Sequence, residues 1–146
     1  MSDAEVVAKS VFLDSNILVY CADRHDLNLQ QRCRSHLHAL RSSGRAVIST
    51  QVLQEFYSVT TRKFGMDPLQ ARAFVTEYRA IPTTVITPDL IDQAIDCSQA
   101  DSISFWDALI IVAASSAGCG FLLTEHLNAG QTIRGVEIVR PSDFLN

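Results

Sequence analysis

Short apolar runs alternate with longer helical stretches along this chain, and no other feature constrains the fold as strongly. The runs are largely free of the polar alternation that marks a half-exposed strand, which is expected for strands covered on both faces. We expect strands at 11–13, 46–48, 84–86, 121–123 and 137–139. The segments with helical spacing or helix-start signals are 16–21, 29–42, 50–64, 67–79, 88–100 and 104–117.

This strand–helix alternation predicts an α/β sandwich with a mostly parallel sheet. The chain has 146 residues, of which 47% are hydrophobic and 19% charged, so it can bury a core and is unlike a disordered chain. We therefore expect a single domain over 1–146, with residues 1–9 as a flexible N-terminal extension. In parallel sheets, functional sites gather at the carboxyl ends of the strands, so the residues after each strand matter most.

The sequence also indicates where such a protein acts. No apolar run reaches the roughly 18–20 residues that cross a bilayer, and the N-terminus lacks the pattern of a signal peptide. The four cysteines are scattered and favour buried apolar roles over a disulfide framework. A zinc site on Cys33, His36 and His38 is disfavoured because their spacing puts them on no single helix face. We expect a cytoplasmic protein without membrane contact.

Charge is distributed unevenly along the chain. The formal net charge is −4, yet residues 24–79 carry nine basic and four acidic side chains, a local balance of +5. Ten of the twelve basic residues are arginine, which binds phosphate bidentately. The basic segment fits a nucleic-acid face, and it equally fits a set of solvated helix faces.

Three acidic residues occupy positions that call for an explanation. Asp14 directly follows the first expected strand, where it could simply cap the next helix. Glu55 lies at the edge of an apolar helical stripe, as a solvated boundary residue also would. Asp107 lies in the first turn of a helix that is apolar nearly all round, where it could complete a capping box with Ser104.

Taken together, these three carboxylates predict a metal site. Like charges about 5 Å apart cost roughly 3 kcal/mol per pair at an effective dielectric constant of about 20, so a cluster of them needs a cation. Oxygen ligands suit Mg²⁺ or Mn²⁺, and such ions serve phosphoryl transfer by activating water. Thr124, Glu125 and His126 follow the fourth expected strand and would lie at the same edge of the sheet.

Four segments of the chain resemble the PIN domain family, and more narrowly the VapC toxins of bacterial toxin–antitoxin pairs. These segments are LDSNILVY, the helix with Glu55, FWDALIIVAA and LLTE-x-L-x-x-G. The resemblance implies a three-layer α/β/α fold, a Mg²⁺- or Mn²⁺-dependent endoribonuclease, a homodimer, and an antitoxin whose tail covers the active site. Its acidic residues map onto Asp14, Glu55 and Asp107, and its first-motif asparagine maps onto Asn16.

The sequence leaves the family pattern at one place. The family usually has Asp directly after the Glu of the last motif, and this chain has His126 there. His126 could bind Mn²⁺, hold a water or contact a phosphate, and the neighbouring Glu125 could swing in instead.

The function we expect is hydrolysis of an RNA phosphodiester. Asp14 and Asp107 would be the principal metal ligands, and Glu55 would bind a metal or orient its water. Asn16 and Thr124 would position these groups or the substrate. A phosphatase would want D-x-D after the first strand, and a receiver domain would want a late lysine; the chain has neither. The remaining alternative is a catalytically weakened PIN-like domain that binds RNA or a partner.

Overall fold

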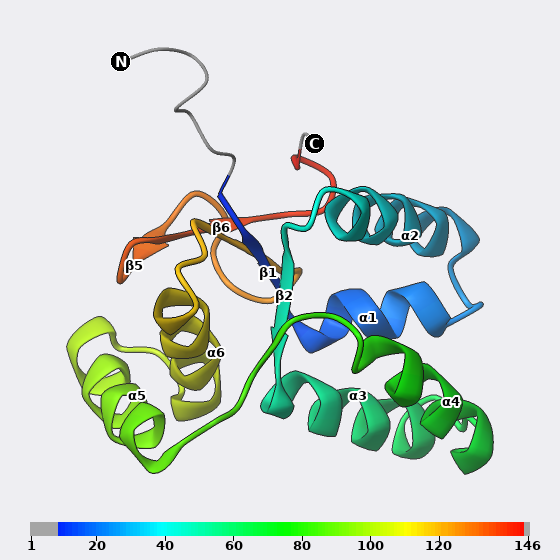
Figure 1. Cartoon of the computed structure of the whole chain (residues 1–146), viewed down its shortest axis with the longest axis horizontal. Coiled ribbons are helices and arrows are strands. Elements are labelled where there is room, and N and C mark those ends of the chain that lie inside the picture. The colour runs from blue at the N-terminus through cyan, green and yellow to red at the C-terminus, as the bar shows by residue number, and fades with distance from the viewer. Residues whose placement is uncertain (1–8, 145–146) are drawn as a thin grey trace.

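The computed structural model describes residues 9–144, and its centre is a six-stranded sheet over that range (Figure 1). The strand order is β3-β2-β1-β4-β6-β5, and all neighbours pair in parallel except β5 with β6. The strands are β1 (Val11–Leu13), β2 (Ala46–Ser49), β3 (Thr83–Thr84), β4 (Phe121–Leu123), β5 (Thr132–Ile133) and β6 (Val136–Val139).

Helices cover both faces of this sheet, which confirms the expected three-layer α/β/α architecture. In Figure 1, α1 to α4 lie on one side of the central strands, and α5 and α6 lie on the other. The helices are α1 (Ser15–Ala22), α2 (Leu27–Ser42), α3 (Thr50–Arg62), α4 (Pro68–Tyr78), α5 (Pro88–Asp101) and α6 (Phe105–Ser116).

The core joins the central strands to buried residues from all six helices. All three residues of β1 are fully buried, and so is most of α6, where residues 108–114 form one continuous buried run. The apolar sequence of α6 therefore reflects a helix packed on all sides, as expected. Trp106, the second residue of this helix, is 62% exposed.

The sequence predicted most elements well and misjudged the two edges of the sheet. The predicted third strand covers 84–86, but β3 covers only Thr83–Thr84 and Val85 is 64% exposed. The strand β5 was missed altogether. It is two residues long and is turned into β6 by Arg134 and Gly135, both with positive φ. Edge strands this short carry too few residues to show a pattern.

The described residues also bear on the predicted N-terminal extension, membrane contact and cysteine roles. Residues 1–8 of the expected extension lie outside the described residues, and the carbonyl of Lys9 accepts a hydrogen bond from Arg45. No helix within residues 9–144 is long and apolar enough to cross a membrane. All four cysteines are free and buried, and burial raises the pKa of Cys21 and of Cys33 to about 12, so these thiols are inert.

Candidate active site

The carboxyl ends of β1 and β4 form one wall of a pocket of about 380 Å³. Asp14 follows β1 and Thr124 follows the parallel neighbour β4, so the register of the sheet brings them together. The α3 and α6 helices complete the pocket from either side. Its lining residues are Asp14, Ser15, Asn16, Glu55, Ser104, Trp106, Asp107, Ile110 and His126.

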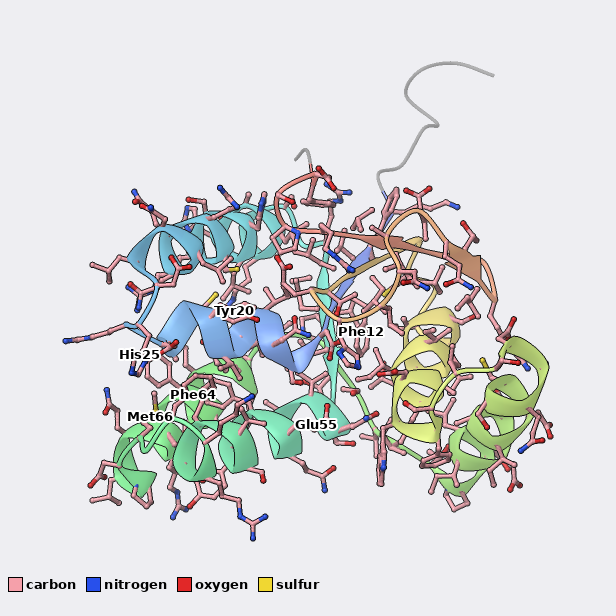
Figure 2. The ribbon with its side chains drawn as sticks, turned by 180° about the vertical axis from the view of Figure 1, so that it is seen from behind. Phe12, Tyr20, His25, Glu55, Phe64 and Met66 are labelled. Atoms are coloured by element: carbon pink, nitrogen blue, oxygen red, sulfur yellow. The ribbon has the colours of Figure 1, made fainter. Side chains whose placement is uncertain are left out.

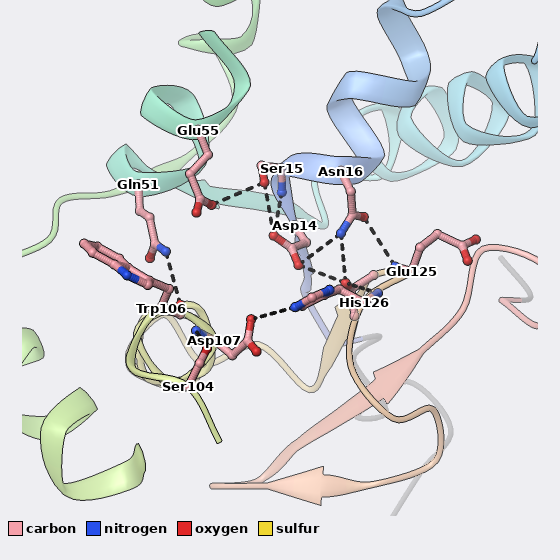
Figure 3. Close-up of polar contacts among 11 residues, drawn as sticks. Asp14, Ser15, Asn16, Gln51, Glu55, Ser104, Trp106, Asp107, Glu125 and His126 are labelled. Carbon is pink, nitrogen blue, oxygen red and sulfur yellow. Dashed lines mark hydrogen bonds and ion pairs between the residues drawn. The ribbon is translucent and has the colours of Figure 1, made fainter. Parts of the chain in front are cut away.

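Asp14 is the most tightly held of the acidic residues. It is the N-cap of α1 and is only 6% exposed. Its Oδ1 accepts a hydrogen bond from the Ser15 amide (2.7 Å), and its Oδ2 accepts from the Thr124 hydroxyl (2.8 Å) and the Asn16 amide (3.3 Å) (Figure 3). Capping and the acidic site are therefore compatible roles of one side chain.

Asn16 connects the ends of the two strands. Its Nδ2 also donates to Thr124 Oγ1 at 3.2 Å, and its Oδ1 accepts from the Glu125 amide at 3.3 Å. The His126 amide donates to Thr124 Oγ1 at 3.0 Å. Asn16 and Thr124, both predicted to position the site, thus orient Asp14 and the turn after β4.

Glu55 reaches the site from α3. Figure 2 shows it at the end of this helix that faces the strands, while Phe64 and Met66 lie at the opposite end. Its Oε1 accepts a hydrogen bond from the Ser15 hydroxyl at 3.2 Å. Partial burial and the charge of Asp14 raise the pKa of Glu55, and the Gln51 and Ser15 side chains lower it.

Asp107 faces the pocket instead of completing a capping box. Its amide donates to Ser104 Oγ at 3.1 Å, so Ser104 caps α6 as expected. Its carboxylate Oδ1 lies 3.4 Å from His126 Nε2. His126 therefore contributes to the pocket, whereas the Glu125 side chain points away from Asp14 and Asp107 in Figure 3.

The pocket carries an excess of negative charge. Burial raises the pKa of Asp14, the Asp107 carboxylate raises it further, and the hydrogen bonds from Thr124 and Ser15 oppose that rise. No lysine or arginine is among the described residues that line the pocket. Ionising all three carboxylates here is costly unless a cation compensates them.

The side chains are of the right type for a hard divalent ion, although they do not form a closed site. Within residues 9–144, no three His, Cys, Asp or Glu side chains are grouped as a ready metal site. The pocket nevertheless presents carboxylates from α3, α6 and the end of β1, together with hydroxyl and amide oxygens. Mg²⁺ binds in this way, through one or two carboxylates plus waters and substrate phosphates.

Sequence reasoning missed three residues of this region. Ser15 links Asp14 to Glu55, and Gln51 donates to the Trp106 carbonyl at 3.1 Å. Trp106 itself lines the pocket. The available signal was helical spacing, because Gln51 precedes Glu55 by four residues and so shares its face of α3.

Comparison with known proteins identifies the family. The model of the PIN domain matches residues 11–126, a range that contains every acidic residue of the pocket. The chain belongs to the PIN domain family. No curated protein matches the sequence.

Several solved structures share the fold at low sequence identity. Mycobacterium tuberculosis VapC20, a toxin that cleaves the sarcin-ricin loop, is 20% identical with a TM-score of 0.61, over 77% of this chain and 87% of that one. A toxin–antitoxin complex from Klebsiella pneumoniae is 21% identical with a TM-score of 0.66, over 90% and 98%. The DNA-bound VapBC from Salmonella typhimurium is 16% identical with a TM-score of 0.68, over 92% and 99%.

Proposed function

We propose that this PIN domain protein is a Mg²⁺- or Mn²⁺-dependent endoribonuclease that hydrolyses RNA phosphodiester bonds. The observation that carries the proposal is the convergence of Asp14, Glu55 and Asp107, from three separate elements, on one pocket with no lysine or arginine among its described lining residues. A phosphodiester brings further negative charge, so the same ion that compensates the acids would also accommodate the substrate.

Each acidic residue takes a role that follows from its contacts. Asp14 and Asp107, on opposite sides of the pocket, would hold the ion, which supplies charge neutralisation and an activated water when bound. Glu55 would orient that water or bind the ion from α3. Ser15 links Glu55 to Asp14, and His126 would keep the Asp107 carboxylate in place until the ion arrives.

The basic segment would seat the RNA backbone. Residues 24–79 contain β2 and the helices α2, α3 and α4, and these helices lie on one side of the sheet in Figure 1. Arginines on this side would bind phosphates on either side of the cleavage point and would add salt-dependent affinity.

We also propose that the protein is the toxin of a toxin–antitoxin pair, and a homodimer. The support is the shared fold with VapC20 and with toxin–antitoxin complexes. The cognate antitoxin would close the pocket with a basic side chain, because a guanidinium can replace the metal's charge against Asp14, Glu55 and Asp107. A complex whose inhibitor binds a remote face and leaves these acids open would contradict this prediction.

The test of the proposed function is cleavage of a generic RNA with Mg²⁺, with Mn²⁺ and with a chelator. We expect cleavage that depends on the metal and is lost in Asp107→Asn. The matched control is Asp92→Asn, which removes an exposed carboxylate on α5 away from the pocket and should cleave like the wild type. Cleavage that survives the chelator or the Asp107→Asn substitution would contradict the proposal.

One observation favours a second candidate, a PIN domain that binds RNA or a partner without cutting. His126 stands where the family usually has an acid, and it lies against Asp107. Binding of RNA in a gel-shift assay, without cleavage at millimolar Mn²⁺, would favour this candidate over the nuclease.

A further inference from the structure

Trp106 is an exposed aromatic side chain at the rim of the acidic pocket. It is the only tryptophan of the chain, 62% of it is exposed, and it lines the pocket together with the carboxylates. It directly precedes Asp107 in α6. A single exposed apolar side chain is common, but a tryptophan beside a site for charged substrate calls for a binding role.

The backbone beneath Trp106 is held firmly. The Trp106 carbonyl accepts a hydrogen bond from Gln51 Nε2 at 3.1 Å, and Gln51 is 4% exposed. The Trp106 ring packs edge-on against Phe105, with ring centroids 5.1 Å apart and an interplanar angle of 76°. Ser104 caps the same turn. The indole therefore sits on a prepared surface and loses little freedom when a ligand binds.

The indole is placed to contact the nucleotide next to the reacting phosphate and not the phosphate itself. In Figure 3 it extends to the side of Gln51, opposite in direction to the Asp107 carboxylate. A phosphate bound at the acids would leave the adjoining nucleotide within reach of this side of α6.

We propose that Trp106 stacks on an unpaired base of the RNA next to the scissile phosphate and so positions single-stranded substrate. This inference rests on the proposed function. Single-stranded nucleic acids are bound by stacking on aromatic side chains, which is worth roughly ten- to a hundredfold in affinity per base and tolerates every base. Stacking would supply binding affinity for RNA, a polyanion that the acidic residues repel.

The first test uses the fluorescence of the sole tryptophan. A short single-stranded RNA is titrated into the wild-type protein in a chelator, and its binding is followed in parallel by anisotropy of a labelled copy. We expect indole emission to be quenched with the same midpoint as the anisotropy change. The same sequence annealed into a duplex should quench far less. Binding by anisotropy with unchanged emission would overturn the inference.

The second test is kinetic. In Trp106→Ala we expect KM for single-stranded RNA to rise roughly tenfold or more with kcat nearly unchanged, and in Trp106→Phe we expect most of the affinity back. The control is Ile95→Ala, which removes another large exposed apolar side chain, from α5 and outside the pocket lining, and should leave KM unchanged. An unchanged KM in Trp106→Ala would overturn the inference.

The two tests separate this inference from the proposed function. RNA that quenches Trp106 but is never cut would support stacking and contradict the nuclease. RNA that is cut with wild-type KM by Trp106→Ala would support the nuclease and contradict stacking. Emission that shifts with protein concentration alone, together with a changed sedimentation coefficient in Trp106→Ala, would place the indole between two copies of the chain and overturn the inference.

Discussion

The two walls of the acidic pocket are built differently. On the strand side, Asp14 is 6% exposed and accepts hydrogen bonds from Ser15, Asn16 and Thr124, while the Thr124 carbonyl is held in turn by Arg140. On the helix side, the Asp107 side chain is 20% exposed and its carboxylate contacts the His126 side chain, which is itself 64% exposed.

This difference separates a fixed carboxylate, Asp14, from an adjustable one, Asp107. Asp14 is held in place by a hydrogen-bond network that spans the ends of β1 and β4, so it would not need to rearrange to bind an ion. Asp107 would lose only its contact with the solvent-exposed imidazole of His126 on binding an ion. A pocket with one rigid and one adjustable carboxylate can admit an ion and a phosphate together without rebuilding the fold.

The largest expected effect separates activity from stability in these two residues. Asp14→Ala and Asp107→Ala should each lower cleavage by roughly a hundredfold or more, because each removes charge that compensates the ion. Only Asp14→Ala should also destabilise the fold, by about 0.5–2 kcal/mol, since it removes the N-cap of α1. Urea unfolding and a cleavage assay on both variants check this. Equal loss of stability in the two variants would contradict the difference between the strand side and the helix side of the pocket.

A smaller effect is expected from Thr124→Val, which keeps the shape of a fully buried side chain and removes the hydroxyl that donates to Asp14. The pKa of Asp14 should rise further, and the metal concentration for half-maximal cleavage should rise roughly tenfold. The control is Thr61→Val, at a partly exposed position of α3 away from the pocket lining. A Thr124→Val protein with wild-type metal dependence would mean that the network around Asp14 does not prepare the ligand.

Metal binding should stabilise the fold in a manner that depends on pH. Because the pKa values of Asp14 and Glu55 are raised from 3.8 and 4.5, folding without metal is favoured by their protonation. That contribution is full below the ordinary values and is lost as the pH rises through the raised ones. Protons and metal compete for these carboxylates, so the increase in Tm with Mn²⁺ should be large at neutral pH and shrink as the pH falls.

Differential scanning calorimetry at several pH values, with and without millimolar Mn²⁺, measures this effect. The gain in Tm should be smaller in Asp107→Asn at every pH. An equal gain in that variant would place the ion elsewhere in the protein.

The sequence predicts the features of the site that depend on neighbouring residues, and it misses the contacts between residues far apart in the chain. Asp14, Glu55 and Asp107 were predictable because each stands at a strand end or on a helix face that the local pattern defines. The link from Gln51 to Trp106 joins residues 55 positions apart and has no local signal. The contact of His126 with Asp107 was likewise out of reach, since it depends on how a turn after β4 meets the start of α6.

The edges of the sheet were poorly predicted for a related reason. The β3 and β5 strands are each two residues long and are defined by pairing with β2 and β6 rather than by their own composition. Errors in these two strands do not affect the predicted site. Its acidic residues depend on β1, β4, α3 and α6, whose predicted bounds are nearly those observed.

The smallest expected effect concerns the adjustable wall. An imidazole is a softer ligand than a carboxylate and suits Mn²⁺ better than Mg²⁺. If His126 joins Asp107 at the ion, the wild type should show a larger advantage of Mn²⁺ over Mg²⁺ than His126→Asp does. Cleavage rates of both proteins in the two metals check this. Identical ratios would mean that His126 only holds the empty Asp107 carboxylate.

The proposed nuclease depends on a divalent ion that Asp14 and Asp107 would hold, and anomalous diffraction from crystals soaked in Mn²⁺ tests this most directly. We expect a manganese peak in the pocket, bonded to oxygens of both Asp14 and Asp107, and no such peak at that place in crystals of Asp107→Asn. Manganese bound only outside the pocket, or bound there without a bond to Asp14, would contradict the account.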